Sequence, residues 1–293
     1  MNYVSIGCST QHDYDFLLPI TAQIWRDVMG YEPVLLLAGD KAEWHKPNRT
    51  GTVMRALLDM DFRHYHIGEI ERGKVSHGAT HYPVGNVAQS ARQHTAVLTD
   101  FDDSDFIILS DADLWPLRYD YYHQVDHTKK MTFWQANAYN YENHCTCHMG
   151  ASAATWREVM GLEQDGDLTR QLKRTLDTDL QELQDGWANQ EPGGMGLSWV
   201  AWNFDEWNTS RRIREMDWYP DQCQMIERVF TDRLDREGWP SVIGTLEGKT
   251  DSHLLRPAQS PENWSKVRQV LGLLSPSLLS WADGFHAEYM EQV

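Results

Sequence analysis

The sequence predicts an α/β fold, in which a mixed, mainly parallel sheet is flanked by helices in a single domain. The chain opens with a strand-like, a helical and another strand-like pattern, over residues 3–9, 16–31 and 33–40. The last of these, PVLLLAGD, is continuously apolar, as in a strand that helices cover on both faces. With 293 residues, the chain is long enough for one large domain with a sizeable core.

The opening elements form a βαβ unit. YVSIGCS, at 3–9, alternates and is rich in β-forming residues, which predicts the first strand. Apolar residues at helical spacing over 16–31 predict a helix that stops at Gly30, and the second strand follows at 33–40. A strand, a helix and a strand in this order indicate a parallel sheet.

Further elements are predicted along the rest of the chain. In order they are a helix at 52–62, a short strand at 64–70, an amphipathic helix at 86–101, a strand from 106, a strand at 131–139, an exposed charged helix at 166–186, helical spacing at 222–239 and at least one helix in the tail. Residues 187–207 are rich in Trp and Gly and show no clear period. A structureless stretch of this length in a compact domain is usually functional.

The charge and composition of the chain limit the classes of partner and the location that it can have. The net charge is −17, from 43 acidic and 26 basic residues, which disfavours a nucleic-acid partner. An anionic small substrate would then need a local cation site. The four cysteines suggest no disulfide framework, no signal peptide is apparent, and no apolar run of 18 residues exists. We therefore expect a soluble, cytoplasmic protein without a membrane span.

Two aspartates end the strand in FIILSDADLWPL. Asp111 and Asp113 follow a run too apolar for an exposed strand, so they are expected at the edge of a buried sheet. Residues i and i+2 of an extended chain point the same way, so both carboxylates can face one cation. Ligands of open α/β sheets bind at the carboxyl ends of the strands. The pattern predicts a Mg²⁺ or Mn²⁺ site; the alternative is a solvated turn or a helix cap.

A strand that ends in Asp-x-Asp on a βαβ scaffold resembles the GT-A (Rossmann-like) glycosyltransferases, especially family 8 and its relatives. VSIGCSTQHDY resembles their first strand and the loop that holds the nucleotide base. NVAQSARQHTAVL resembles the helix whose arginine, here Arg92, lies near the sugar diphosphate. CHMGASAATWREV resembles the segment after the Asp-x-Asp, with His148 where the family usually has Asn.

Two later segments extend the resemblance to about residues 3–257. WYPDQCQMIERVF resembles the Asp-Gln segment near the reacting sugar, as Asp221 and Gln222. DSHLLRP resembles the segment with the late histidine that is the third metal ligand, as His253. The family continues with Gly and then Lys-Pro-Trp, whereas Arg256 and Pro257 stand here, so the match is partial.

The resemblance implies roles for individual residues. The metal ligands would be Asp111, Asp113 and His253, and an imidazole would favour Mn²⁺ over Mg²⁺. Asp111 would contact either the metal, through a water molecule, or the ribose of the nucleotide. The nucleotide-sugar residues would be Ser9, Thr10, Asp40, Arg92, Asp111, Ala112 and Arg256. Both arginines would bind diphosphate oxygens, or else form surface ion pairs. Ser9, Thr10 and Asp40 would lie near the base and ribose, or else be ordinary turn residues.

The reacting groups are predicted less specifically. An inverting enzyme needs a carboxylate to accept the proton of the acceptor hydroxyl, with Asp221 first and Asp205 or Glu206 next. In a retaining enzyme, Asp221 and Gln222 would instead face the donor sugar. One or two tryptophans near the Trp-rich stretch are expected to reach an acceptor sugar, the others filling core: Trp187, Trp199, Trp202 and Trp207.

The predicted function is metal-dependent transfer of a hexosyl or pentosyl group from a nucleotide diphosphate sugar, expected to be a UDP-sugar, to a carbohydrate hydroxyl. Residues 1–117 would bind the nucleotide sugar, 118–257 would form the acceptor side, and 258–293 would be a helical tail. One alternative is a nucleotidyltransferase, which would want a basic, Gly-rich loop after the first strand. Others are a glycoside hydrolase, disfavoured because neighbouring carboxylates cannot flank a bond, and a non-catalytic carbohydrate-binding protein.

Overall fold

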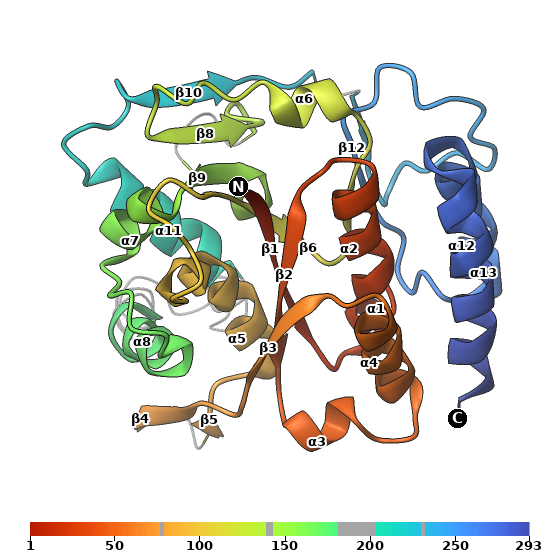
Figure 1. The fold of residues 1–293 in the computed structure, drawn as a ribbon, viewed down its shortest axis with the longest axis horizontal. Helices are drawn as coiled ribbons and strands as arrows, with labels where there is room; N and C mark the ends of the chain where they lie inside the picture. Colours follow the sequence, from red (N-terminus) through yellow and green to blue (C-terminus); the bar gives the residue numbers. More distant parts are fainter. Residues whose placement is uncertain (77–78, 139–142, 181–202, 230–231, 293) are drawn as a thin grey trace, which may run out of the picture.

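The computed structural model describes residues 1–76, 79–138, 143–180, 203–229 and 232–292. Within these residues, a seven-stranded sheet has the order β10-β8-β9-β6-β1-β2-β3 (Figure 1). The strands are β1 Asn2–Ser9, β2 Glu32–Ala38, β3 Arg63–Ile67, β6 Phe106–Asp111, β8 Met131–Trp134, β9 Met149–Ser152 and β10 Cys223–Ile226. All neighbours pair in parallel except β9, which is antiparallel to both β6 and β8. The predicted mixed, mainly parallel α/β sheet is confirmed.

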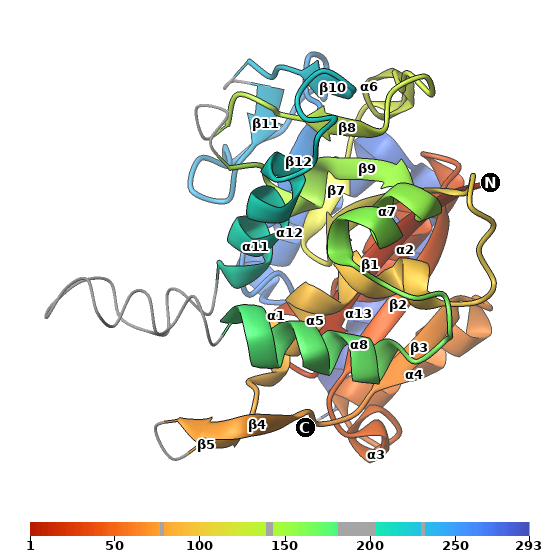
Figure 2. The same cartoon turned by 90° about the vertical axis from the view of Figure 1, so that its left-hand side faces the viewer.

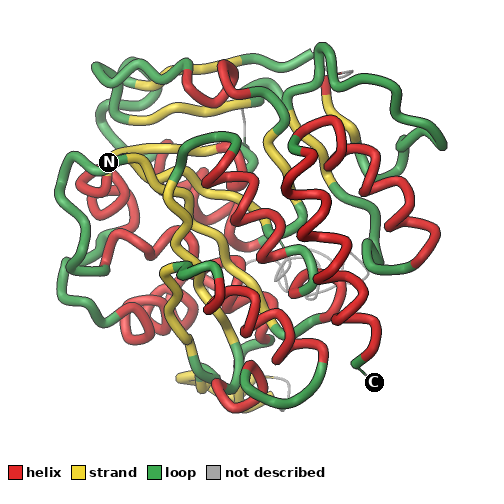
Figure 3. The backbone as a smooth tube through the Cα atoms, turned by 45° about the vertical axis from the view of Figure 1, so that its right-hand side comes forward, coloured by secondary structure: helices red, strands yellow, loops and turns green. Residues whose placement is uncertain are grey.

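Helices cover both faces of the sheet. One face carries α2 Leu18–Asp27, α4 Arg49–Asp59, α12 Pro261–Leu274 and α13 Pro276–Glu291; the other carries α5 Val84–Ala91, the 3-10 helix η1 Arg92–Val97, α7 Ala153–Met160, α8 Leu168–Thr175 and α11 Phe204–Arg214 (Figures 1 and 3). Each face has its own apolar cluster. In β2, Leu35 and Leu37 join one cluster while Leu36 and Ala38 join the other, which explains the continuous apolar run.

Helix α5 lies directly on β1, and one glycine permits this. A Cβ at Gly7 would lie 1.9 Å from the backbone oxygen of Ala88. No side chain fits in that space, so α5 approaches the strand at the closest possible distance. The contact places the end of α5 and the start of η1 above the carboxyl ends of β1 and β6, where Asp111 stands.

A three-stranded sheet beside the main one returns the late part of the chain to this point. Its order is β11 Arg233–Leu234, β12 Asp251–His253 and β7 Leu114–Pro116. Strand β12 runs antiparallel to β7 and pairs His253 with Leu114, the residue after Asp113. The backbone N–H of Leu254 also donates to the Asp113 oxygen at 2.9 Å.

The remaining elements are short. They are α1 His12–Asp15, α3 Lys41–Trp44, α6 Tyr119–His123, η2 Thr146–His148, a π-helical turn at Leu176–Leu180, and the hairpin β4 Glu71–Ser76 with β5 Ala79–His81. Figure 2 shows this hairpin extending away from the main sheet. No helix among the described residues is both long and apolar enough to cross a membrane.

Several predicted elements differ from those observed. The helical spacing at 222–239 is wrong, because Cys223–Ile226 pairs with β8 as the edge strand β10 and Arg233–Leu234 forms β11. Sheet pairing across the fold overrides local spacing here. The helix expected at 86–101 is α5 and then the 3-10 helix η1. In the aperiodic stretch, α11 begins at Phe204, and 187–202 lies outside the described residues.

Candidate active site

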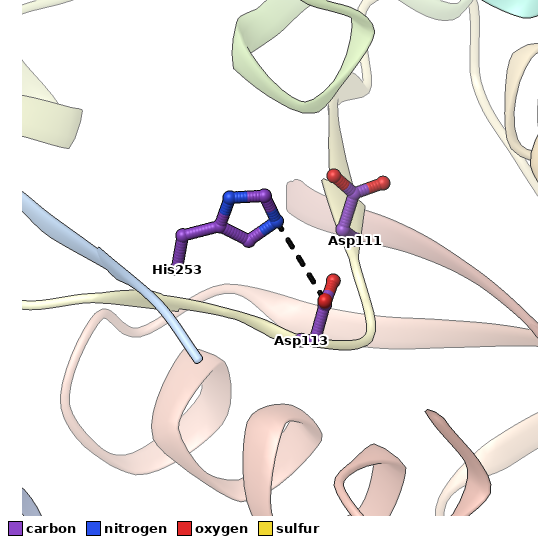
Figure 4. Close-up of side chains that lie close together, drawn as sticks. All are labelled: Asp111, Asp113 and His253. Atoms are coloured by element: carbon purple, nitrogen blue, oxygen red, sulfur yellow. Dashed lines mark ion pairs between the residues drawn. The ribbon is translucent and has the colours of Figure 1, made fainter. Parts of the chain in front are cut away.

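Three groups with metal-binding atoms converge at the carboxyl end of β6. Asp111 is the last residue of β6, Asp113 follows in the turn, and His253 ends β12 (Figure 4). One ligand atom from each lies within 4.8 Å of the others, and His253 Nε2 is 3.6 Å from Asp113 Oδ2. Among the described residues this is the one group of three or more such side chains that could hold a metal ion. We refer to these three residues as the DxD cluster.

Local contacts fix the backbone of this cluster. The hydroxyl of Thr21, in α2, donates to the Ala112 oxygen at 2.6 Å, and Trp115 Nε1 donates to the same hydroxyl at 2.9 Å. Together with the β7–β12 pairing, these bonds hold the turn between Asp111 and Asp113. His253 Nδ1 faces Asp235 Oδ1 at 3.7 Å, which leaves Nε2 directed at Asp113. A carboxylate behind a histidine in this way is the usual outer support of a metal-binding imidazole.

The two aspartates have opposite electrostatic surroundings. Burial raises the pKa of Asp113, and the neighbouring Asp111 carboxylate adds to this, outweighing the opposing His253 and Arg256. Burial also acts on Asp111, but the adjacent Arg92 guanidinium outweighs it and lowers the pKa of Asp111. Two carboxylates so close together repel each other, and a divalent cation between them would remove that cost.

A cavity of about 230 Å³ surrounds the cluster. It includes the carboxyl end of β1, the turn after β6, the start of α11 and the end of β12. Nine of the predicted site residues line this cavity: Ser9, Arg92, Asp111, Ala112, Asp113, Asp205, Glu206, His253 and Arg256. Tyr14, Gln89 and Thr146 also contribute to its wall.

Arg92 is expected to offer its guanidinium to a diphosphate, but the structure shows that guanidinium bound to protein groups. Its side chain is 4% exposed, and its nitrogens already have protein partners. Nη1 donates to Asp111, and Nη2 donates to Asp205 Oδ2 at 2.6 Å and to Thr146 at 3.1 Å. Nε donates to the Gln89 oxygen at 3.1 Å. Arg92 therefore connects the Asp-x-Asp turn to α11, and its contacts orient Asp111.

Arg256 has a more open position. Its Nε lies 3.1 Å from Asp113 Oδ2, its Nη1 donates to the Tyr14 hydroxyl, and the guanidinium lies over the Tyr14 ring at 4.5 Å. A quarter of its side chain is exposed. It is therefore a cationic group on the wall of the cavity, within reach of an anion held beside the cluster.

The first turn of α11 supplies two further carboxyls. Asp205 is buried and paired with Arg92 and with the Thr146 hydroxyl at 2.8 Å. Glu206 has no such pairing with an arginine, and burial, with Asp205 and Asp111 nearby, raises its pKa to about 8. Glu206 thus holds its proton near neutral pH, which suits a group that exchanges protons with a bound ligand.

Asp221 and Gln222 do not line the cavity, so the structure does not bring them together with the other predicted site residues. They precede β10, which runs in the same direction as β6 because two antiparallel pairings, through β9, separate β8 from β6 and β10 is parallel to β8. They therefore lie at the amino end of the sheet, opposite the end where Asp111 stands. Asp221 is exposed, and its oxygen accepts from Lys129 Nζ at 2.8 Å.

Two residues predicted to bind the nucleotide sugar lie outside the cavity. Asp40 is exposed and caps α3, with its Oδ1 accepting from the Ala42 N–H at 2.9 Å. Thr10 follows β1 but does not line the cavity. Both fit the alternative of ordinary turn residues. Of the tryptophans expected at an acceptor, Trp207 is half-buried in α11, and the others lie outside the described residues: Trp187, Trp199 and Trp202.

Two features of the site were missed in the sequence. Arg236 donates to Asp113 and to His253, and only the fold of the β11–β12 connection brings it there. Behind the cluster, His148 Nε2 lies 2.8 Å from Asp251 Oδ2, and Arg233 Nε donates to Asp251 Oδ1 at 2.8 Å. Asp251 is fully buried, yet His148 and Arg233 outweigh that burial and hold its pKa well below the usual range.

Comparison with known proteins gives structural matches alone. No family model and no curated protein matches the chain. An active-site mutant of LgtC is 10% identical with a TM-score of 0.47, over 97% of this chain and 95% of LgtC. The galactosyltransferase LgtC in complex with donor and acceptor sugar analogs is also 10% identical, with a TM-score of 0.45, over 100% and 96% of the two chains.

A second matched protein is larger. The apo form of the glycosyltransferase GlyE from Streptococcus pneumoniae TIGR4 is 11% identical with a TM-score of 0.36. The match covers 77% of this chain and 45% of GlyE, so the chain spans less than half of that protein's length.

Proposed function

We propose that this chain is a metal-dependent glycosyltransferase of the GT-A type. It would transfer a sugar from a nucleotide diphosphate sugar, with UDP as the nucleotide, to a carbohydrate hydroxyl. The observation that carries the proposal is the convergence of Asp111, Asp113 and His253 within 4.8 Å, in a cavity at the carboxyl ends of β1 and β6.

The donor set of the DxD cluster fits a small divalent cation. Mg²⁺ and Mn²⁺ prefer carboxylate oxygens and share their shell with substrate phosphates, and an imidazole favours Mn²⁺. Asp111 and Asp113 would supply the carboxylates and His253 Nε2 the imidazole. A bound cation would stabilise negative charge on the departing nucleoside diphosphate. It would also let a protein of net charge −17 hold such an anion.

The surrounding side chains would divide the remaining work. Arg256 is placed to pair with diphosphate oxygens, because its guanidinium lies beside Asp113 and is partly exposed. Arg92 would keep Asp111 oriented through its buried contacts. Glu206 would be the first candidate to accept the acceptor proton once it is ionised, and a cation held beside Asp111 would lower its pKa and so favour the ionised form. If configuration is retained, Glu206 would instead face the donor sugar. It takes this role from Asp221 because it lines the cavity.

Binding calorimetry tests the proposal. We expect the wild type to bind UDP in the presence of Mn²⁺ and far more weakly without it. Asp113→Ala should lose the Mn²⁺-dependent part, and GDP should bind less well than UDP. Asp40→Ala is a matched control, because it also removes a carboxyl that follows a strand but leaves the cavity intact. Equal binding by wild type and Asp113→Ala would contradict the proposal.

A nucleotidyltransferase acting on sugar phosphates is the second candidate, since a cation beside Asp113 would suit that chemistry too. The products separate the two reactions. A glycosyltransferase releases a nucleoside diphosphate from a nucleotide sugar, whereas a nucleotidyltransferase releases pyrophosphate from a nucleoside triphosphate. The segment after β1, Thr10-Gln11-His12-Asp13, contains no Lys or Arg for a triphosphate, which favours the glycosyltransferase.

A further inference from the structure

Arg236 makes an unusual pair of contacts within the DxD cluster. It lies in the connection between β11 and β12, and 23% of its side chain is exposed. One nitrogen, Nη2, donates both to Asp113 Oδ2, at 3.1 Å, and to His253 Nε2. These two acceptor atoms are the ones that the cluster would offer to a cation.

The chemistry of the imidazole means that His253 cannot accept from Arg236 and ligate a cation at the same time. With its Nδ1 facing the Asp235 carboxylate, neutral His253 carries its proton there and has a single lone pair, on Nε2. That lone pair can accept from Arg236 or ligate a cation, but it cannot do both. Asp113 Oδ2 is similarly crowded, since Arg236 and Arg256 both lie 3.1 Å from it.

We propose that Arg236 is an internal competitor for the cation site. Binding of a divalent cation to His253 displaces the guanidinium, but Arg236 lies only two residues after β11 and therefore stays beside the cavity. There it can pair with an oxygen of the bound diphosphate. The displacement opposes binding of the cation alone, and the new pairing favours binding of cation and nucleotide together. Arg236 thus makes the two ligands cooperative, a reciprocal coupling in which each raises the affinity for the other.

This inference rests on the cation site of the proposed function, and Mn²⁺ binding without nucleotide tests it. Titrations at pH 8 would be followed by the electron paramagnetic resonance signal of free Mn²⁺. We expect Arg236→Gln to bind Mn²⁺ at least ~10-fold more tightly than wild type. Added UDP should raise Mn²⁺ affinity strongly in wild type and at least ~10-fold less in Arg236→Gln.

Two further variants separate lone-pair competition from a simple loss of positive charge. Arg256→Gln removes an equal charge at the same distance from Asp113 but does not contact His253, so its gain in Mn²⁺ affinity should be smaller. In a His253→Ala background, the gain from Arg236→Gln should also shrink. Circular dichroism would check folding, and Arg236→Lys, expected to give a smaller change in the same direction, serves if Arg236→Gln does not fold.

The outcomes distinguish this inference from the proposed function. If wild type binds Mn²⁺ and Arg236→Gln binds it equally or more weakly, the competition is refuted while the cation site stands. Equal gains from Arg236→Gln and Arg256→Gln would also refute it, because charge alone would then explain the effect. If neither wild type nor Arg236→Gln binds Mn²⁺, with or without UDP, both the inference and the proposed function fail.

Discussion

Replacing Arg92 by glutamine should lower the free energy of unfolding more than replacing an exposed arginine does. Its guanidinium is 4% exposed and lies between Asp111 and Asp205. Arg92→Gln removes the positive charge and leaves the Asp205 carboxylate, also 4% exposed, without its cationic partner. Asp111 is 30% exposed and can be partly hydrated, so most of the cost falls on Asp205.

The expected magnitude follows from the burial of both partners. Removing one member of a buried ion pair costs about 3–5 kcal/mol, because the other charge stays in the interior. For a chain of 293 residues, an unfolding entropy of about 2.1 cal/mol/K per residue converts this into a fall of roughly 5–8 °C in Tm. Arg170, 58% exposed beside Asp165, is the matched control, and Arg170→Gln should cost less than about 1 kcal/mol.

Urea unfolding of four proteins would measure the effect. Wild type, Arg92→Gln, Asp205→Asn and the double variant form a cycle, and the double variant should lose about 1–3 kcal/mol less than the two single losses together. If Arg92→Gln remains within about 1 kcal/mol of wild type, or the cycle shows additive losses, the pair does not hold α11 to the Asp-x-Asp turn.

Three more predictions concern the strand–helix contact, the acid on α11 and the support of His253. Gly7→Ala should lower the free energy of unfolding in urea by about 1–3 kcal/mol or more, because its Cβ would meet the Ala88 oxygen at 1.9 Å. Glu206, with its pKa raised to about 8, binds a proton in the folded state that the unfolded chain releases above its ordinary pKa. Stability from this group is therefore full at low pH and lost as pH rises to about 8, and Glu206→Gln should flatten that loss in melts across pH 5–9. Asp235→Asn should weaken Mn²⁺ binding by ~10-fold or more, whereas Glu237→Gln, an equal charge change in the same connection, should do so by less.

Controls make these outcomes decisive. Gly68→Ala meets no atom within 4 Å and should leave stability nearly unchanged, so equal effects at Gly7 and Gly68 would contradict the packing argument. A Glu206→Gln protein with the same stability profile as wild type between pH 5 and 9 would show that Glu206 titrates normally. Equal losses of Mn²⁺ affinity in Asp235→Asn and Glu237→Gln would mean that net charge, and not support of the imidazole, controls binding.

Local pattern was enough to predict the part of the site that one strand carries. The apolar run before Asp111 indicated a buried strand, and the i, i+2 spacing indicated that both carboxylates can serve one cation. His253 followed from resemblance, and the β7–β12 pairing supplies the physical reason for its position. These features depend on short segments whose pattern determines their conformation.

The errors arose where distant pairing decides the outcome. Nothing in WYPDQCQMIERVF indicates that Cys223–Ile226 joins the edge of the sheet, or that this strand runs parallel to β6. That direction sends Asp221 to the amino end, and Glu206 lines the cavity instead. The contacts of Arg92 and Arg236 depend in the same way on α11 and on the β11–β12 connection, which local spacing does not predict.

Cleavage of a nucleotide sugar is the most direct test of the central claim. A panel of UDP-sugars would be incubated with Mn²⁺ and a set of carbohydrate acceptors, with ³¹P and ¹H NMR recording the nucleotide and anomeric signals. The account predicts that wild type releases UDP from at least one donor only when Mn²⁺ is present, and that Asp113→Asn slows the release at least ~100-fold. If no donor is cleaved, or if Asp113→Asn cleaves it as fast as wild type, the account is contradicted.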